Sequence, residues 1–219
     1  MSKYVIHACP QRMWYVNDFL IPSLKNQGIE DIDVRCDTQK LGNLEKCMNI
    51  FSVMNEDGGS WHLQDDVIIC RDFAERTKKY SGDDVVCGYV WENSTNLDKI
   101  GWTAPQDMWW SFPCIYIPNK MARECSKWYY GWAKRDEKYK IYFGKKQYDD
   151  YFFREFLLVY YPEMPVLHIK PCLVDHIDYL IGGTTILPSG RGEESHSKWF
   201  EDTDLVDELK MKLEGYRHG

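Results

Sequence analysis

The sequence lacks the features that mark several large classes of protein. Its eight cysteines form no C-x-x-C pair, which excludes the usual spacing of zinc sites and thiol redox motifs. No basic-then-apolar leader is present, and no apolar run approaches the roughly twenty residues that a membrane-spanning helix requires. We therefore expect a cytoplasmic protein without an integral membrane segment, with its cysteines as buried free thiols.

Internal repeats, low-complexity tracts and long linkers of proline, glycine or serine are also missing. The 219 residues, 44% of them hydrophobic, can bury a sizeable core, and we expect a single domain over residues 1–219. The formal net charge of -7 argues against an extended surface that follows nucleic-acid phosphates. A local basic groove is compatible with that charge, so nucleic acid stays open as an acceptor.

Apolar segments of two kinds alternate along the chain. Short runs predict strands, and apolar residues at helical spacing predict helices between them. Strands are expected at 4–9, 32–37, 61–64, 85–90 and 166–169, and helices at 14–28, 41–51, 73–80, 120–132, 149–161 and around 205–213. The stretch before residue 120 is less regular. This alternation predicts an α/β fold with a mainly parallel central sheet flanked by helices.

An acidic pair, Asp65 and Asp66, follows the predicted strand at 61–64. In open α/β sheets, ligands gather outside the carboxyl ends of strands. Adjacent aspartates there can hold a hard divalent cation, which neutralises the charge that grows on a departing diphosphate. The same pair could instead cap the next helix or solvate a turn, so the pattern alone allows both interpretations.

The segment Leu63-Gln64-Asp65-Asp66-Val67, preceded by two glycines and a tryptophan, resembles the metal-binding stretch of GT-A glycosyltransferases. In that family an acidic motif of the D-x-D kind ends a short strand, and here Gln64 stands at the familiar first aspartate position. The resemblance implies that Asp66 contacts the metal directly. It implies that Asp65 is oriented toward the ribose, a water or the groups around the metal.

The segment Pro171 to His176, followed by Leu180-Ile181-Gly182, is similar to the closing motif of the same family. Many members have a histidine there that ligates the same metal, so the resemblance implies that His176 joins Asp66. One imidazole with carboxylates suits manganese better than magnesium, and we expect Mn2+ in preference to Mg2+. A lone histidine can also be a structural residue that hydrogen-bonds to the backbone.

A second acidic pair, Asp149 and Asp150, begins the predicted helix at 149–161. Transfer with inversion requires a carboxylate that takes the proton of the acceptor. The arrangement from Gly144 to Asp150, ahead of an aromatic-rich helix, is similar to the acidic motif that carries the base in inverting GT-A enzymes. The resemblance implies that Asp150 is the base and that Asp149 caps the helix. From the residues alone, both aspartates could serve only the helix terminus.

The same resemblance implies contacts to the nucleotide and the diphosphate. Arg12, in the loop after the first strand, could reach the base, ribose or phosphate, or could be solvated. Asp37, at the end of the second strand, could accept a hydrogen bond from the nucleotide, and Lys46 lies on the polar side of the next helix.

A late loop at 189–198 resembles the segment that folds over the diphosphate in this family, with Arg191 and Lys198 placed to neutralise charge. Aromatic rings are expected on the acceptor side, from Trp102, Trp109 and Trp110.

These expectations combine into one function. We predict a GT-A-like, Rossmann-like domain with a nucleotide-sugar-binding half at about 1–95 and an acceptor and catalytic half at about 96–219. It would transfer a sugar, with metal dependence and inversion, from a nucleotide-diphosphate donor to a hydroxyl of a glycan, a small molecule or a modified nucleobase. The small size is typical of bacterial or phage-encoded enzymes. The alternatives are a nucleotidyltransferase, which the glycine-free loop Ala8 to Arg12 disfavours, and a noncatalytic GT-A-like domain.

Overall fold

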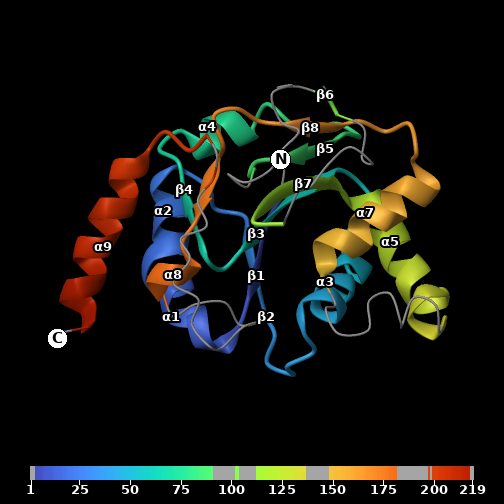
Figure 1. Ribbon diagram of the computed structural model, residues 1–219, viewed down its shortest axis with the longest axis horizontal. Coiled ribbons are helices and arrows are strands. Elements are labelled where there is room, and N and C mark those ends of the chain that lie inside the picture. Colours follow the sequence, from blue (N-terminus) through green and yellow to red (C-terminus); the bar gives the residue numbers. More distant parts are fainter. Residues whose placement is uncertain are drawn as a thin grey trace.

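A computed structural model describes residues 3–90, 102–103, 112–136, 148–181, 197 and 199–217. Its centre is a seven-stranded mixed sheet with the strand order β2-β1-β3-β7-β5-β8-β6 (Figure 1). The strands are β1 (Lys3–Ala8), β2 (Ile32–Cys36), β3 (Gly59–Gln64), β5 (Val85–Cys87), β6 (Trp102–Thr103), β7 (Cys114–Pro118) and β8 (Val166–His168).

The directions of these strands follow from their pairing. β1 runs parallel to β2 and β3, and β5 runs parallel to β8. β7 is antiparallel to both β3 and β5, and β6 is antiparallel to β8. Among the described strands of this sheet, five therefore point one way and two, β7 and β6, point the other. The prediction of an α/β fold with a mostly parallel sheet is confirmed at this level, and the antiparallel β7 is the main difference.

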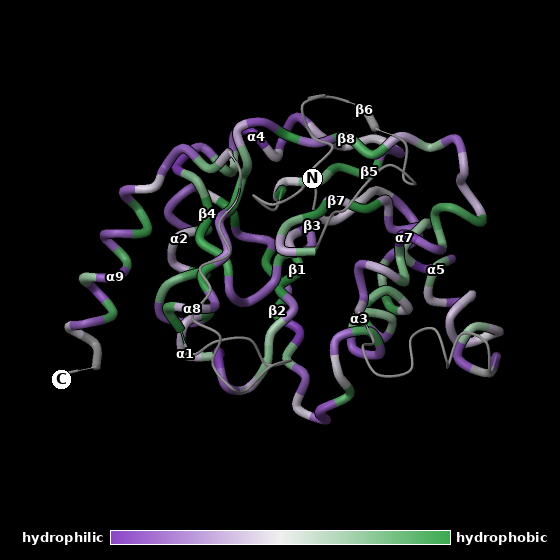
Figure 2. The backbone as a smooth tube through the Cα atoms, viewed as in Figure 1, coloured by the Kyte–Doolittle hydropathy of each residue, from purple (hydrophilic) through white to green (hydrophobic). Residues whose placement is uncertain are grey.

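Helices cover both faces of the sheet (Figure 1). On one side lie η1 (Pro10–Arg12), α1 (Met13–Tyr15), η2 (Val16–Leu20), α2 (Ile21–Asn26), α4 (Phe73–Thr77), α8 (Asp178–Ile181) and α9 (Thr203–Arg217). On the other side lie α3 (Asn43–Ser52), α5 (Asn119–Gly131), η4 (Ala133–Arg135) and α7 (Asp149–Tyr160). Figure 2 shows hydrophobic and hydrophilic residues alternating along α9, as expected of an amphipathic helix that rests on the molecule by one face.

The alternation of side chains along β1 divides the core between these two faces. Tyr4, Ile6 and Ala8 pack with the first group of helices, whereas Val5 packs with α3, α5 and α7. All eight cysteines are unpaired, and six of them are buried, as predicted for free thiols; Cys9 and Cys36 are partly exposed. Within the described ranges, none of the helices combines the length and the apolar character that crossing a membrane requires.

The chain changes direction across the sheet at β1 and β3. After β1 the chain passes through α2 to β2, which lies next to β1 at the edge of the sheet. It then returns through α3 to β3, which pairs with the other edge of β1. From β3 it continues outward to β5 and β8. The carboxyl ends of β1 and β3 therefore flank a topological switch point, where open α/β sheets bind their ligands.

A second, two-stranded sheet lies beside this point. It is formed by β4 (Val67–Ile69) and β9 (Val174–His176), which pair in antiparallel fashion with Val67 opposite His176. β4 begins directly after the acidic pair that ends β3. The pairing therefore brings a late segment of the chain to the switch point.

Candidate functional site

Asp65 joins the loop after β1 to the turn after β3. Its Oδ2 accepts a hydrogen bond of 2.6 Å from the backbone N–H of Cys9, and its Oδ1 accepts one of 2.9 Å from Nη1 of Arg12. Both carboxylate oxygens are thus engaged with protein donors. The expected role of Asp65, oriented toward the ribose, a water or the groups around the metal, stays a prediction.

Asp66 is engaged through one oxygen only. Its Oδ2 accepts a hydrogen bond from Nη1 of Arg12 and lies 3.2 Å from Nε2 of His176. Its Oδ1 is buried and has no hydrogen-bond partner among the described residues. A buried carboxylate oxygen without a donor or a cation costs free energy, so this atom is the natural contact for a ligand.

Arg12 lies between the two aspartates and is only 5% exposed. Burial acts to lower the pKa of Arg12, but the charges of Asp66 and Asp65 outweigh it and raise that pKa. The alternative of a solvated arginine was wrong, because Arg12 is buried against Asp65 and Asp66. The expected contact of Arg12 with the nucleotide stays a prediction. The guanidinium of Arg12 forms ion pairs with both aspartates. These ion pairs offset the cost of burying its charge.

His176 reaches the acidic pair from β9. Besides the contact to Asp66, its Nδ1 lies 3.4 Å from Oδ1 of Asp178, which orients the ring. Burial acts to lower the pKa of His176, but Asp66 and Asp178 outweigh it and raise that pKa. The sequence interpretation missed Asp178, although an acid two residues after a candidate histidine ligand was a usable signal.

The pKa values of the two neighbouring aspartates are shifted in opposite directions. Burial acts to raise the pKa of Asp66, but His176 and Arg12 outweigh it and hold that pKa well below its usual range. Burial and the charge of Asp66 raise the pKa of Asp65. Asp66 therefore loses its proton more readily than Asp65.

The second acidic pair begins α7. Tyr148 is the N-cap residue and makes no side-chain cap, so the expectation that Asp149 caps this helix was wrong. Asp149 is the first helical residue, and its Oδ1 accepts a 3.1 Å hydrogen bond from the N–H of Asp150. Oδ1 of Asp150 accepts one of 2.8 Å from the N–H of Tyr151. Asp149 is buried, whereas Asp150 is partly exposed.

Electrostatic effects connect the second pair to the first. Burial and the charge of Asp149 raise the pKa of Asp150 to about 7. The pKa of Asp149 is raised mainly by burial, with a contribution from the charge of Asp66, and Lys46 opposes both. Lys46 also acts to lower the pKa of Asp65. The two acidic pairs and Lys46 therefore lie within electrostatic reach of one another.

The remaining residues that were predicted to contact the donor or acceptor make no described contact with Asp65, Asp66 or His176. Asp37 accepts hydrogen bonds from the N–H groups of Leu41, at 2.9 Å, and of Gly42, at 3.1 Å, and so shapes the loop before α3. Arg191, Lys198, Trp109 and Trp110 lie outside the described residues, and so does the side chain of Trp102.

Asp66 and His176 are the two residues of this edge that could take part in holding a divalent cation. Within the described residues no group of three or more histidine, cysteine, aspartate or glutamate side chains is arranged to hold a metal. Hard divalent cations in transferases, however, are commonly held by one or two protein ligands with substrate phosphates and water. Asp66 and His176 supply a carboxylate and an imidazole, and the partnerless Oδ1 of Asp66 is available to a cation.

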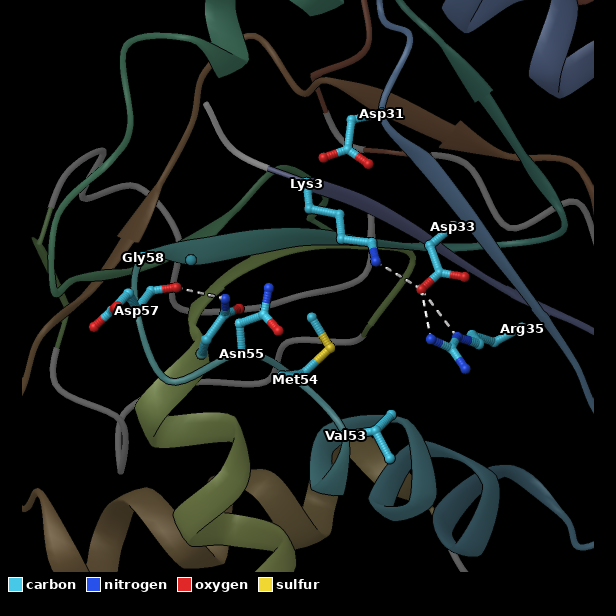
Figure 3. A pocket seen from close by; sticks show the side chains of 11 residues that line it. Lys3, Asp31, Asp33, Arg35, Val53, Met54, Asn55, Asp57 and Gly58 are labelled. Carbon is cyan, nitrogen blue, oxygen red and sulfur yellow. Dashed lines mark hydrogen bonds and ion pairs between the residues drawn. The ribbon is translucent and has the colours of Figure 1, made fainter.

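A cavity of about 150 Å³ lies at the other edge of the sheet, near the amino ends of β1, β2 and β3 (Figure 3). Three of its charged side chains, Lys3, Asp33 and Arg35, pair with one another. Asp33 pairs with Lys3 at 2.9 Å and with Arg35 at 2.7 Å.

Comparison of the chain with models of known protein families and with curated proteins gave no match. The geometry of the carboxyl edge is therefore the main indication of function. The structure brings together Arg12, Asp65, Asp66 and His176 in direct contact. Lys46 and the pair at the start of α7 lie within electrostatic reach of this group.

Proposed function

We propose that this chain is a metal-dependent glycosyltransferase that moves a sugar from a nucleotide-diphosphate donor to a hydroxyl acceptor with inversion. One observation carries the proposal: Asp66 and His176 meet at the switch point of an α/β sheet, with one buried carboxylate oxygen of Asp66 lacking a partner. That position is where such sheets bind nucleotides. The donor set is one that a manganese ion accepts.

The donor side of the reaction depends on positive charge. A divalent cation held by Asp66 and His176 would supply charge neutralisation to the diphosphate as its bond to the sugar breaks. Lys46 is partly buried, and its charge acts on Asp65 and Asp149 at the same edge. The side chain of Lys46 makes no hydrogen bond or ion pair with any described residue. Its ammonium group is free to meet a phosphate oxygen.

The acceptor side depends on a base. The oxygen of the acceptor hydroxyl attacks the anomeric carbon, the bond from that carbon to the diphosphate oxygen breaks, and the hydroxyl proton passes to the carboxylate of Asp150. A base is most effective when its pKa lies near the working pH, and the pKa of Asp150 is raised to about 7. Asp150 is also the more exposed member of its pair.

The test is incubation of the protein with a panel of nucleotide sugars, with and without Mn2+, while the release of free nucleoside diphosphate is followed. Release that depends on Mn2+ is expected from at least one donor. A parallel panel of nucleoside triphosphates with sugar phosphates separates the alternative reaction, because a nucleotidyltransferase releases pyrophosphate instead. Absence of Mn2+-stimulated release from every donor contradicts the proposal, and absence of nucleotide binding as well favours a noncatalytic domain.

Three variants assign the parts. Asp66→Asn keeps the side-chain shape and should remove Mn2+-dependent donor binding. Asp150→Asn should leave donor binding intact and remove transfer. Asp207→Asn, an exposed acid on α9, is the matched control and should change neither. Equal loss of binding in the first two variants would mean that the roles are wrongly divided.

A further inference from the structure

A pair of buried histidines lies beside the candidate site and has no part in the mechanism above. His7 of β1 and His62 of β3 are 7% and 1% exposed, and Nε2 of His7 lies 2.9 Å from Nδ1 of His62. The ring of Phe51 packs edge-on against His62, with 5.2 Å between ring centroids. In the pairing of β1 with β3, His7 stands opposite Gln64, the residue before Asp65. The pair therefore lies just inside the carboxyl edge.

Burial of the pair favours one arrangement of protons on the two rings. Nε2 of His62 is buried and has no hydrogen-bond partner among the described residues. A proton on that atom would be a buried N–H group without an acceptor. That costs more free energy than leaving a ring nitrogen without a donor. The proton of His62 therefore belongs on Nδ1, which donates to Nε2 of His7. Because Nε2 of His7 accepts, the proton of a neutral His7 must be on Nδ1.

Both rings are neutral at physiological pH. Burial lowers the pKa of His62 to about 3. Burial also lowers the pKa of His7, and the charges of His62 and Lys46 lower it further. Nδ1 of His7 has no partner among the described residues, and it is not closed off from solvent in the way that Nε2 of His62 is. Its N–H group is therefore a neutral donor available at the carboxyl edge.

We propose that His7, held in one tautomer by His62, donates a hydrogen bond to a neutral oxygen of the nucleoside part of the donor. This inference rests on the proposed function and names a residue that selects the nucleotide. A neutral N–H offers no charge to a phosphate, which Lys46 and a cation at Asp66 serve better. It matches a carbonyl oxygen of the base or a hydroxyl oxygen of the ribose. The hydrogen bond from His7 therefore contributes to binding of the nucleoside and not to binding of the diphosphate.

The test compares two kinds of ligand. Binding of UDP, GDP and dTDP, and of inorganic pyrophosphate, is measured by calorimetry in the presence of Mn2+. His7→Phe keeps a ring and removes the donor, and His7→Asn keeps an N–H near the position of Nδ1. His168→Gln changes another buried histidine, in β8, and is the matched control.

For the diphosphate that the wild type binds, His7→Phe should weaken binding about 3- to 10-fold, as expected for one neutral hydrogen bond. Pyrophosphate binding should be unchanged. His7→Asn should recover most of the affinity, and His168→Gln should bind like the wild type. Unchanged nucleotide affinity in His7→Phe, or an equal loss for nucleotide and pyrophosphate, would overturn the proposal.

A second measurement separates this inference from the proposed function. Nitrogen-15 NMR of the free protein reports the tautomer of each histidine directly. The account predicts neutral rings with protons on Nδ1 of both His7 and His62, and a proton on Nε2 of His62 would overturn it. If nucleotide binds and is turned over while His7→Phe changes nothing, the inference alone fails. If the wild type binds none of the nucleotides, the proposed function fails, and the role of His7 fails with it.

Discussion

Nε2 of His176 lies 3.2 Å from Oδ2 of Asp66, although the two residues are far apart in the sequence. The contact exists because β9 pairs with β4 in a register that sets His176 opposite Val67. A two-stranded sheet of three-residue strands thus completes the candidate cation site.

Arg12 is predicted to act as an internal cation. Removing one partner of a buried ion pair leaves uncompensated charge, so Arg12→Gln should lower the free energy of unfolding by about 3–5 kcal/mol without metal. Mn2+ should restore part of this loss, because it can neutralise the two aspartates in place of the guanidinium. Thermal unfolding with and without Mn2+ measures both effects.

The matched control for that experiment is Arg35→Gln. Arg35 is an exposed arginine that pairs with Asp33 at 2.7 Å, and its loss should cost no more than about 1 kcal/mol, with no response to Mn2+. If Mn2+ stabilises Arg12→Gln no more than it stabilises the wild type, Arg12 and the cation do not share a site.

Asp150→Asn should abolish transfer and yet stabilise the protein at high pH. The pKa of Asp150 is raised to about 7, so the native state binds more protons than the unfolded state between the ordinary aspartate range near 4 and about 7. Stability contributed by this group therefore falls as pH rises through that window. The variant should gain melting temperature over the wild type at pH 8 and not at pH 4. Equal shifts at both pH values would show that the carboxylate is not destabilised by its surroundings.

Asp204→Asn is the control, because its effect on stability should have the opposite sign at pH 8. Hydrogen bonds from Arg71 hold the pKa of Asp204 below its usual range, so its stabilising effect is present at neutral pH and is lost as pH falls through the lowered pKa. This exposed variant should be slightly less stable than the wild type at pH 8.

Binding of Mn2+ should weaken at low pH because the cation competes with a proton on His176. Asp66 and Asp178 outweigh burial and raise the pKa of His176, so the metal must displace a more tightly held proton. Affinity should fall by up to about tenfold per pH unit below that pKa. Calorimetry in buffers of different ionisation enthalpy should detect proton release. In His176→Gln, affinity should be weaker and its dependence on pH between 6 and 8 should flatten; an unchanged profile would remove His176 from the site.

The start of β3 is predicted to be closed to any side chain. A Cβ atom added at Gly59 would lie 2.2 Å from Oη of Tyr116, whose ring is buried beside it. Gly59→Ala should therefore lower the free energy of unfolding by about 1–3 kcal/mol, measured by urea unfolding. Gly82→Ala meets no atom within 4 Å and should stay close to the wild type. Similar values for the two variants would contradict the packing described for β3 and β7.

Periodicity located most of the long elements and could not locate the short ones. The repeats behind α3, α5 and α7 span several turns and carry a clear signal. β7 is a continuous buried run, Cys114–Pro118, without the alternation that marks a half-buried strand. β4 and β9 have three residues each, and only their pairing with each other defines them as strands.

Some features of the site could be predicted from the sequence, and others could not. Asp66 and Asp150 stand out in the sequence because each belongs to an acidic pair at the boundary of a predicted element. The burial of Arg12 between Asp65 and Asp66 depends on tertiary contacts that local sequence does not encode. The same is true of the hydrogen bond between His7 and His62, which joins neighbouring strands.

We predict that Asp66 and His176 hold a divalent cation at the carboxyl edge of β3. A titration with Mn2+, followed by the electron paramagnetic resonance signal of the free ion, tests it without any knowledge of donor or acceptor. The account predicts one bound ion in the wild type, an affinity at least about tenfold lower in Asp66→Asn, and no change in the exposed control Asp207→Asn. Absence of binding by the wild type, or equal affinity in Asp66→Asn, would contradict it.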